Sequence, residues 1–368
     1  MSDVLNIDVP NIGQLSYAAN REYMSRPADQ RFETIDALKA AVDARRMVSF
    51  ETMADVTDME FVPSPEGGIY VASKKLPAPA LPTHYSFGQA AALVKAPAAY
   101  LRTLPNDLAA KALNYGVSQR DAESIKLLSF DDDALDRTRV QAFTSQTYGR
   151  IWDADVVAAA QKIVGADPRW TNPLEWSGKR GGLYASDRDC FMFFIDGGSM
   201  VDGGSDRDQL NRGFFMWNSE VGNATFGIAS FLFRVVCGNH IIHNMEGVKL
   251  LRIRHTSGGP ERFINEAIPA LQEYVAASAK PLEETVKRAK LFLLPKEEND
   301  FSQFFLTKGF SKGEVRRAKA MADQMEGQSA FLWDMVNGFT AIARELAFVD
   351  ARNDLDKRAG KLLDLVKA

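Results

Sequence analysis

Two arginines and a threonine alternate in the segment KLLRIRHT, in a pattern that suits phosphate binding. Arg252, Arg254 and Thr256 are two residues apart, so on a β-strand their side chains lie on one face. Guanidinium groups donate paired hydrogen bonds to phosphate oxygens. The spacing therefore predicts a phosphate-binding strand face. The alternative is a solvated face whose ion pairs contribute about 0–1 kcal/mol each.

The same two-residue spacing places Tyr148 beside Arg150 in the segment TYGRIWD. If this segment is a strand, the aromatic ring and the guanidinium group share a face and can stack on a nucleic-acid base. The alternative is a packed tyrosine next to an arginine paired with Asp153, because aromatic side chains most often belong to a core.

A basic tract interleaved with phenylalanines lies in the last third of the chain, and Lys312, Arg316 and Arg317 are its densest part. A basic groove with aromatic side chains suits single-stranded nucleic acid, where stacking contributes about 1–3 kcal/mol per base. The alternative is a pair of amphipathic helices with buried phenylalanines and solvated cations, because lysine and arginine stems often cover apolar surface.

Cys237, His240 and His243 follow the pattern C-x-x-H-x-x-H. A zinc site needs three or four ligands in fixed geometry, whereas three steps along a strand reverse the face on which a side chain lies. The alternative is a buried cysteine, a turn, and histidines with local hydrogen bonds. We therefore expect no metal site here and no cofactor, and Cys237 with His240 lacks evidence of the third group that a nucleophilic pair needs.

The elements that must position these residues change in type along the chain. Aromatic and β-branched runs between about 180 and 256 predict successive strands, and helical spacing prevails after Pro260. Pro97 and Pro105 each indicate the start of a helix. We expect an α+β fold in which a central antiparallel β-sheet meander is flanked by a helical N-terminal module and long C-terminal helices. The expected divisions are an α+β segment at 1–85, a small helical module at 86–130, an antiparallel β core at 140–260 and a helical region at 261–368.

Composition narrows the compartment and the partners. The chain has 368 residues, a net charge of −4 and only two cysteines, so neither a disulfide scaffold nor a uniformly basic DNA binder is indicated. The N-terminal residues lack a basic and apolar signal sequence, and no apolar run is long enough to cross a bilayer. We expect a soluble, cytoplasmic protein without a membrane partner.

Several blocks of the sequence resemble one known family. The blocks AFTSQTYGRIWD, NSEVGNATFGIASFLFRVVCGNHI, RIRHT and FLWDMVNGFTAIAREL are similar to those of the family called domain of unknown function 932, the phage/plasmid-like proteins, over about residues 80–350. The chain departs from a histidine-containing turn that is frequent in this family, because it has Glu220 and Val221 after Asn218 and Ser219. The resemblance implies a role in phage or plasmid DNA metabolism, with no assigned activity.

These observations leave two kinds of function open. The first is binding of single-stranded nucleic acid by a homo-oligomer, as in strand annealing or recombination. The second is a non-enzymatic counter-defence factor that binds a host protein, which predicts an exposed apolar patch of several hundred Å². A metal-dependent nuclease is the weakest option, because the acidic residues show no metal-ligand spacing.

Overall fold

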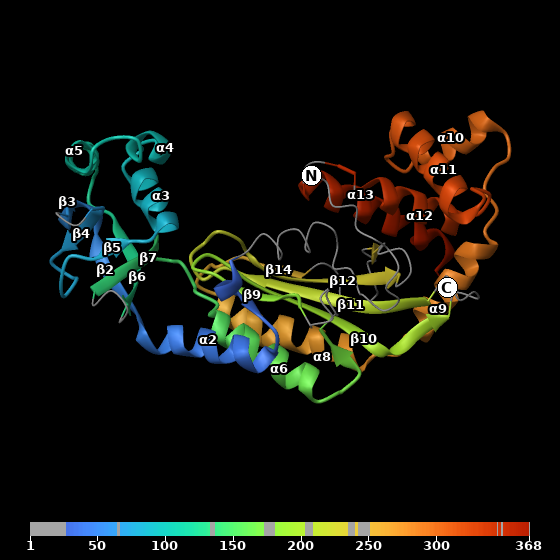
Figure 1. The fold of residues 1–368 in the computed structure, drawn as a ribbon, viewed down its shortest axis with the longest axis horizontal. Helices are drawn as coiled ribbons and strands as arrows, with labels where there is room; N and C mark the ends of the chain where they lie inside the picture. Colours follow the sequence, from blue (N-terminus) through green and yellow to red (C-terminus); the bar gives the residue numbers. More distant parts are fainter. Residues whose placement is uncertain are drawn as a thin grey trace.

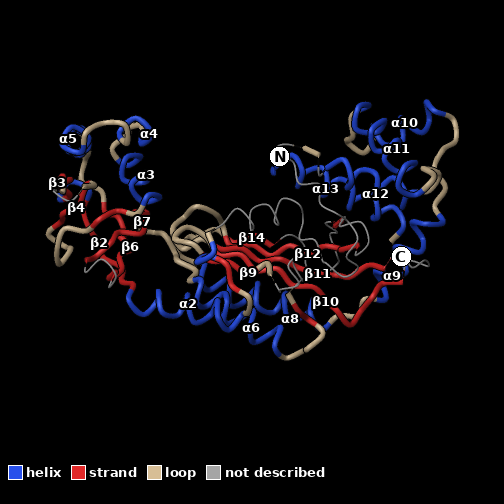
Figure 2. Tube along the Cα trace, viewed as in Figure 1, coloured by secondary structure: helices blue, strands red, loops and turns tan. Residues whose placement is uncertain are grey.

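The structure is a computed structural model that describes residues 27–64, 67–132, 137–172, 181–202, 209–234, 240–241, 251–343, 345–346 and 349–367. It has three parts: a small α+β unit near the N-terminus, a large central sheet with helices on one face, and a group of helices near the C-terminus (Figures 1 and 2). The central sheet lies between the two smaller parts, which we call the N-terminal unit and the C-terminal unit.

Four consecutive strands form the centre of the large sheet, and each pairs antiparallel with the next: β9 (Leu183–Ala185), β10 (Cys190–Asp202), β11 (Gln209–Asn218) and β12 (Phe226–Arg234). Shorter strands pair with these: β1 (Arg31–Phe32), β8 (Trp170–Thr171), β13 (His240–Ile241) and β14 (Leu251–Ile253). The expected α+β fold with a central antiparallel meander and C-terminal helices is confirmed.

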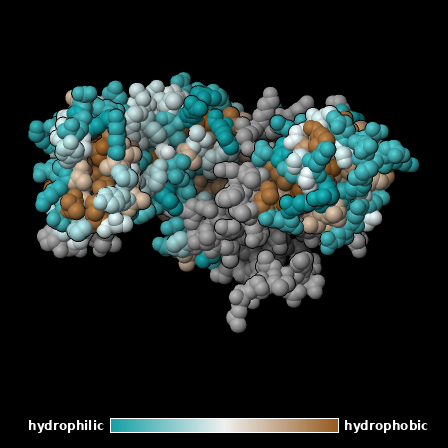
Figure 3. All heavy atoms as spheres, turned by 90° about the horizontal axis from the view of Figure 1, so that it is seen from above, coloured by the Kyte–Doolittle hydropathy of each residue, from teal (hydrophilic) through white to brown (hydrophobic). Residues whose placement is uncertain are grey.

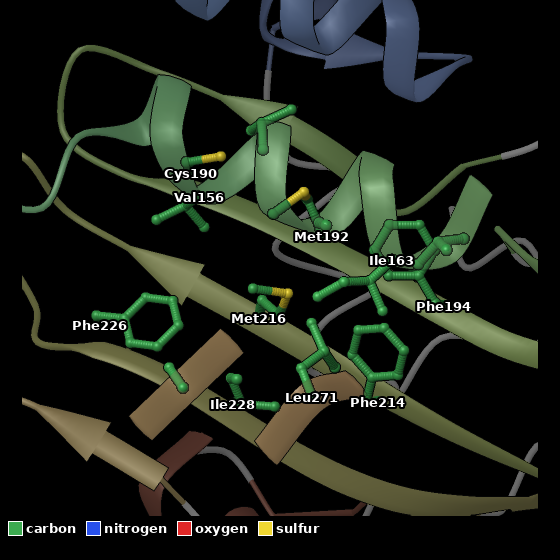
Figure 4. Close-up of a cluster of buried hydrophobic side chains, with 14 of the residues drawn as sticks. Val156, Ile163, Cys190, Met192, Phe194, Phe214, Met216, Phe226, Ile228 and Leu271 are labelled. Carbon is green, nitrogen blue, oxygen red and sulfur yellow. The ribbon is translucent and has the colours of Figure 1, made fainter. Parts of the chain in front are cut away.

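Every second residue of these strands faces a helical layer. The side chains in Figure 4 show this alternation, with apolar residues at 190, 192 and 194 on β10, 214 and 216 on β11, and 226 and 228 on β12. They pack against three helices: α2 (Ile35–Val48), α6 (Asp153–Gly165) and α8 (Ile268–Ala276). A helix α7 (Gly259–Arg262) and a π-helical turn η4 (Phe263–Ala267) lead into α8. The other face carries aromatic rings in mutual contact, among them Phe191, Phe193, Phe215 and Phe231.

The N-terminal unit packs helices on a four-stranded sheet and a hairpin. Its strands are β2 (Ser49–Asp55), β3 (Met59–Pro63), β4 (Ile69–Ser73), β5 (Leu81–Pro82), β6 (Ser124–Asp132) and β7 (Arg137–Ser145). Its helices are α3 (His84–Leu93), α4 (Ala98–Leu101) and α5 (Asn106–Ser118). The prolines at 97 and 105 directly precede α4 and α5, as their fixed backbone angle favours.

The expected division at residue 86 falls inside the N-terminal unit. One hydrophobic cluster joins residues from Ala54 to Phe143, so the helices at 86–118 and the strands around them share a core. Helical spacing alone gave no information about which strands these helices cover. The hydrophobic core of the N-terminal unit therefore contains residues from both expected regions, 1–85 and 86–130, and also from strand β7.

The C-terminal unit is built from helices around one aromatic-rich core. They are α9 (Lys280–Leu291), α10 (Glu298–Leu306), α11 (Lys312–Glu326), α12 (Leu332–Ala343) and α13 (Val349–Lys361). Helix α11 begins at a capping box, in which the Ser311 hydroxyl accepts from the Glu314 N–H and the Glu314 carboxylate accepts from the Ser311 N–H. Within the described residues, none of the helices combines the length and apolar character needed to cross a bilayer.

Candidate nucleic-acid interface

Three loops meet at the end of the central sheet that faces the N-terminal unit. They contain residues 146–152, 219–225 and 254–258. The backbone of Tyr148 pairs with that of Thr256, and the Gly149 N–H donates to the His255 carbonyl at 3.1 Å. A Cβ atom on Gly149 would lie 1.9 Å from the Thr256 carbonyl oxygen, so the two backbones approach as closely as they do because this residue is glycine.

The alternation expected between residues 251 and 256 is present. Arg252, Arg254 and Thr256 are exposed, whereas Ile253 and His255 are buried. The regular strand is shorter than KLLRIRHT, because β14 covers only 251–253 and Thr256 belongs to the bridge with residue 148. The guanidinium carbon of Arg252 lies 5.9 Å from the ring centroid of Trp217.

The exposed arginines of this segment carry no salt bridge to any residue that the structure describes. Arg254 lies near the point where the backbones of Gly149 and Thr256 approach each other, which we call the crossing of the loops. Its carbonyl oxygen is 2.7 Å from where a Cβ on Gly259 would be. Both guanidinium groups are therefore available to an external anion.

The guanidinium carbon of Arg150 lies 5.2 Å from the ring centroid of Tyr148, so the expected pairing of ring and guanidinium is present, but Arg150 is buried and is not open to a base. Only 5% of the residue is exposed, its Nε donates to the Glu51 carboxylate at 2.9 Å, and one Nη donates to the Glu220 carbonyl. Strand β7 ends at Ser145, so the residues around Arg150 form a loop and the assumed face alternation does not apply. Arg150 instead ties β2 of the N-terminal unit to the loop that follows β11.

Tyr148 is half-buried and stacks on His255, with 5.1 Å between ring centroids and 10° between ring planes. Its hydroxyl donates to the Ser219 carbonyl at 3.1 Å. Burial raises the pKa of Tyr148, so the phenol remains neutral. The Nδ1 of His255 accepts from the Ile151 N–H at 3.3 Å, and burial, followed by the charge of Arg150, lowers the pKa of His255 to about 4.

Two buried carboxyl groups lie beside Arg150. The Glu220 carboxylate accepts from the Asp153 N–H at 2.7 Å, so it caps the first turn of α6. The Asn218 amide donates to the Asp153 carboxylate at 2.7 Å and to the Ile151 carbonyl at 2.9 Å. Burial, reinforced by Glu220, raises the pKa of Asp153 well above its usual range, and burial also raises the pKa of Glu220.

The hydrogen bonds of these carboxyl groups hold the loop after β11 and the end of β11 against the start of α6. The nearby Cys190 is buried, and this burial raises the pKa of its thiol. In the part of the chain that the structure describes, no three His, Cys, Asp or Glu side chains gather as a metal ion requires. Two polar atoms of this network, Arg150 Nη2 and Asn218 Oδ1, have no hydrogen-bond partner among the described residues.

Lys312, Arg316 and Arg317 do not join the loop cluster. They are exposed on α11, which packs on α12 within the C-terminal unit, whereas the loops lie at the opposite end of the central sheet (Figure 1). Arg317 pairs with Glu345 at 2.5 Å. These three helix cations therefore lie apart from the strand arginines Arg252 and Arg254.

The candidate metal ligands are only partly covered by the structure. Cys237 and His243 lie outside the described residues. His240 belongs to β13, where its backbone pairs with Phe233.

The sequence patterns did not indicate that Glu51, Asn218 and Glu220 hold the three loops in place. The segments TYGRIWD, NSEVG and RIRHT contain most residues of these loops, and each segment has a charged residue that could have indicated a polar contact between them. The three blocks are distant in sequence and adjacent in the fold.

A family comparison agrees with these blocks. A family model described as a domain of unknown function (DUF932) matches residues 142–359. A comparison with curated proteins and with solved structures found no significant match. Residues 142–359 are more than half of the chain and include all three loops, so this protein belongs to the DUF932 family.

Proposed function

We propose that this protein binds single-stranded nucleic acid through the exposed face formed by Arg252, Arg254 and Thr256. The observation that carries the proposal is the exposure of both guanidinium groups on one side of a segment whose other side is buried. A nucleic-acid backbone presents phosphates that such groups bind bidentately. The acidic net charge of the chain makes a local interface more suitable than binding over the whole surface.

The cellular setting belongs to the same proposal. A role in replication, recombination or strand annealing of a phage or plasmid, carried out in the cytoplasm by a homo-oligomer, fits the interface and the family resemblance. The alternative, binding of a host protein, needs a large apolar patch. On the face seen in Figure 3, both end units are mainly hydrophilic with small hydrophobic areas.

The proposal predicts loss of binding when both arginines are replaced. In fluorescence anisotropy with a labelled oligothymidylate, the variant Arg252→Ala/Arg254→Ala should bind at least about tenfold more weakly at low salt, because charge-assisted hydrogen bonds to phosphate are lost. The slope of log affinity against log salt should fall by about 1.4, since each phosphate contact on a single strand contributes about 0.7.

The matched control is Lys74→Ala/Lys111→Ala, which removes two exposed positive charges from the N-terminal unit. Both lysines already pair with acidic residues, Asp58 and Asp107, so binding should remain as in the unchanged protein. Circular dichroism checks that each variant is folded. Absence of binding by the unchanged protein at low salt, or equal binding by the arginine variant, contradicts the proposal.

A further inference from the structure

Three half-buried aromatic side chains lie near the loop that carries Val221, next to the proposed interface. Tyr85 and Trp152 pack against the buried cluster that contains Val221. Tyr148 lies next to the following residue of this loop, because a Cβ on Gly222 would be 3.6 Å from its ring. The three rings come from α3, from the loop after β7 and from the residue before α6, and we call them the aromatic cluster.

Three exposed arginines border the aromatic cluster. The guanidinium carbon of Arg46 lies 3.6 Å from the ring centroid of Trp152. The Arg188 carbonyl accepts from the Ser219 hydroxyl at 2.6 Å, which places Arg188 beside the loop of Val221. Burial raises the pKa of the Tyr85 phenol, and the charge of Arg188 opposes this rise. Arg254 lies two residues before Thr256, whose backbone pairs with Tyr148.

Among the described residues, the bordering arginines are not held in ion pairs, as some exposed arginines elsewhere in the chain are. Arg262 pairs with Glu266 at 2.8 Å and Arg317 with Glu345 at 2.5 Å. Arg46, Arg188 and Arg254 form no salt bridge with any described residue. Asp189, which follows Arg188, accepts a hydrogen bond from the Ser186 hydroxyl at 2.7 Å instead.

Tyr148 already stacks on His255, and Arg46 covers the ring of Trp152. The groups left for a base are therefore the Tyr85 ring and the exposed Arg46 guanidinium. An aromatic ring and guanidinium groups without ion pairs to described residues match the two parts of a nucleotide. Unpaired bases stack on aromatic rings and on guanidinium planes, and the phosphates bind the cations. A duplex hides the faces of its bases, so this pairing of groups selects single strands. We propose that the aromatic cluster and its three bordering arginines form a base-stacking site, an inference that rests on the proposed function and extends it.

The N-terminal unit contributes to this site. Tyr85 belongs to α3, and Arg46 to α2, so both precede the residues 142–359 that match the family model. The Gln89 amide on α3 donates to the Val221 carbonyl at 2.7 Å and accepts from the Phe143 N–H at 3.0 Å. These bonds hold Tyr85 against the loop that carries Val221.

The test compares two labelled strands of equal length, an oligothymidylate and an abasic strand with the same phosphates. The unchanged protein should bind the oligothymidylate at least about fivefold more tightly, the lower end of what stacking one base contributes. Tyr85→Leu and Arg46→Ala should reduce this ratio toward one while leaving the affinity for the abasic strand within about twofold, because stacking is base-dependent. Arg188→Ala should weaken binding to both strands, because it removes a phosphate contact.

Tyr115→Leu is the matched control for Tyr85→Leu, since Tyr115 is 70% exposed on α5 away from the cluster. It should leave the ratio unchanged. If Tyr85→Leu and Arg46→Ala keep the full ratio while Arg252→Ala/Arg254→Ala loses binding, the base-stacking site is wrong and the proposed function stands. If the unchanged protein binds neither strand, the proposed function fails and the site with it.

Discussion

Two arginines are buried in the central part of the molecule, and their surroundings differ. Arg212 on β11 is fully buried; its guanidinium donates to the Asp196 carboxylate at 2.9 Å and to the carbonyls of Tyr274 and Val275 at the end of α8. Arg150 bonds to the partly exposed Glu51 and to the Glu220 carbonyl, and one of its nitrogens lacks a partner among the described residues.

Arg212 therefore forms a purely structural contact, whereas Arg150 lies in a region that borders solvent. Arg212 places a positive charge at the C-terminal end of a helix, where unpaired carbonyls attract it, and its carboxylate partner is buried too. Arg150 joins loops whose outer side carries exposed arginines and half-buried rings. Buried charge therefore stabilises the fold around Arg212, and around Arg150 it positions the loops of the proposed interface.

The largest effect is expected for Arg212→Met. It removes the closest cation from the buried Asp196 carboxylate and leaves Arg169 at 3.9 Å as a more distant one, so the free energy of unfolding should fall by about 3–5 kcal/mol. Urea denaturation measures this loss. Arg212→Met/Asp196→Leu should recover part of it, because no uncompensated charge remains. A loss below about 1 kcal/mol would contradict the assignment of Arg212 as the main structural ion pair.

A smaller loss, about 2 kcal/mol, is expected for Arg150→Met. The side chain of Glu51 is 35% exposed and regains water when its partner is removed, so less charge stays unsatisfied than around Arg212. The same denaturation experiment ranks the two variants. A greater loss for Arg150→Met than for Arg212→Met would reverse the comparison.

The smallest effect is a dependence of stability on pH that comes from His255, which lies near Arg150. Because the pKa of His255 is lowered to about 4, the unfolded chain binds its proton more tightly, and the stability from this group is complete above about 6.5 and decreases as the pH falls toward 4. His255 should therefore cost the protein about 1–2 kcal/mol of unfolding free energy between pH 7 and pH 5.

His255→Asn isolates this contribution, since its side-chain oxygen can replace Nδ1 as the acceptor from Ile151. Asp153 and Glu220 have raised pKa values, so they act in the opposite direction and stabilise the fold as the pH falls. The decrease in stability from pH 7 to pH 5 should be smaller in the variant than in the unchanged protein. Equal pH profiles would show that His255 does not titrate as its burial requires.

Local sequence patterns predicted those features that are decided by residues close together in the sequence. The alternation of Arg252 and Arg254 with Ile253 follows from strand geometry, and the structure confirms it. The starts of α4 and α5 follow from the fixed backbone angle of proline. The antiparallel meander follows from successive aromatic and β-branched segments joined by short turns.

The burial of Arg150 could not be predicted in this way. Its partners, Glu51 and Glu220, are 99 and 70 residues distant in sequence, and no local spacing connects them. The packing of Tyr85 near Tyr148 likewise depends on how the N-terminal unit meets the central sheet. Long-range polar contacts thus decided which side chains face solvent.

The close approach at Gly149 has a consequence for how this chain and its relatives change over time. Any side chain at this position would collide with the Thr256 carbonyl and with Pro260, and it would separate two loops that each supply part of the interface. Gly259 approaches the same crossing from the other loop. Relatives that keep this close approach of the two loops should therefore retain both glycines even where the exposed arginines differ. Ligand preference can then change among relatives while the backbone that positions the arginines stays the same.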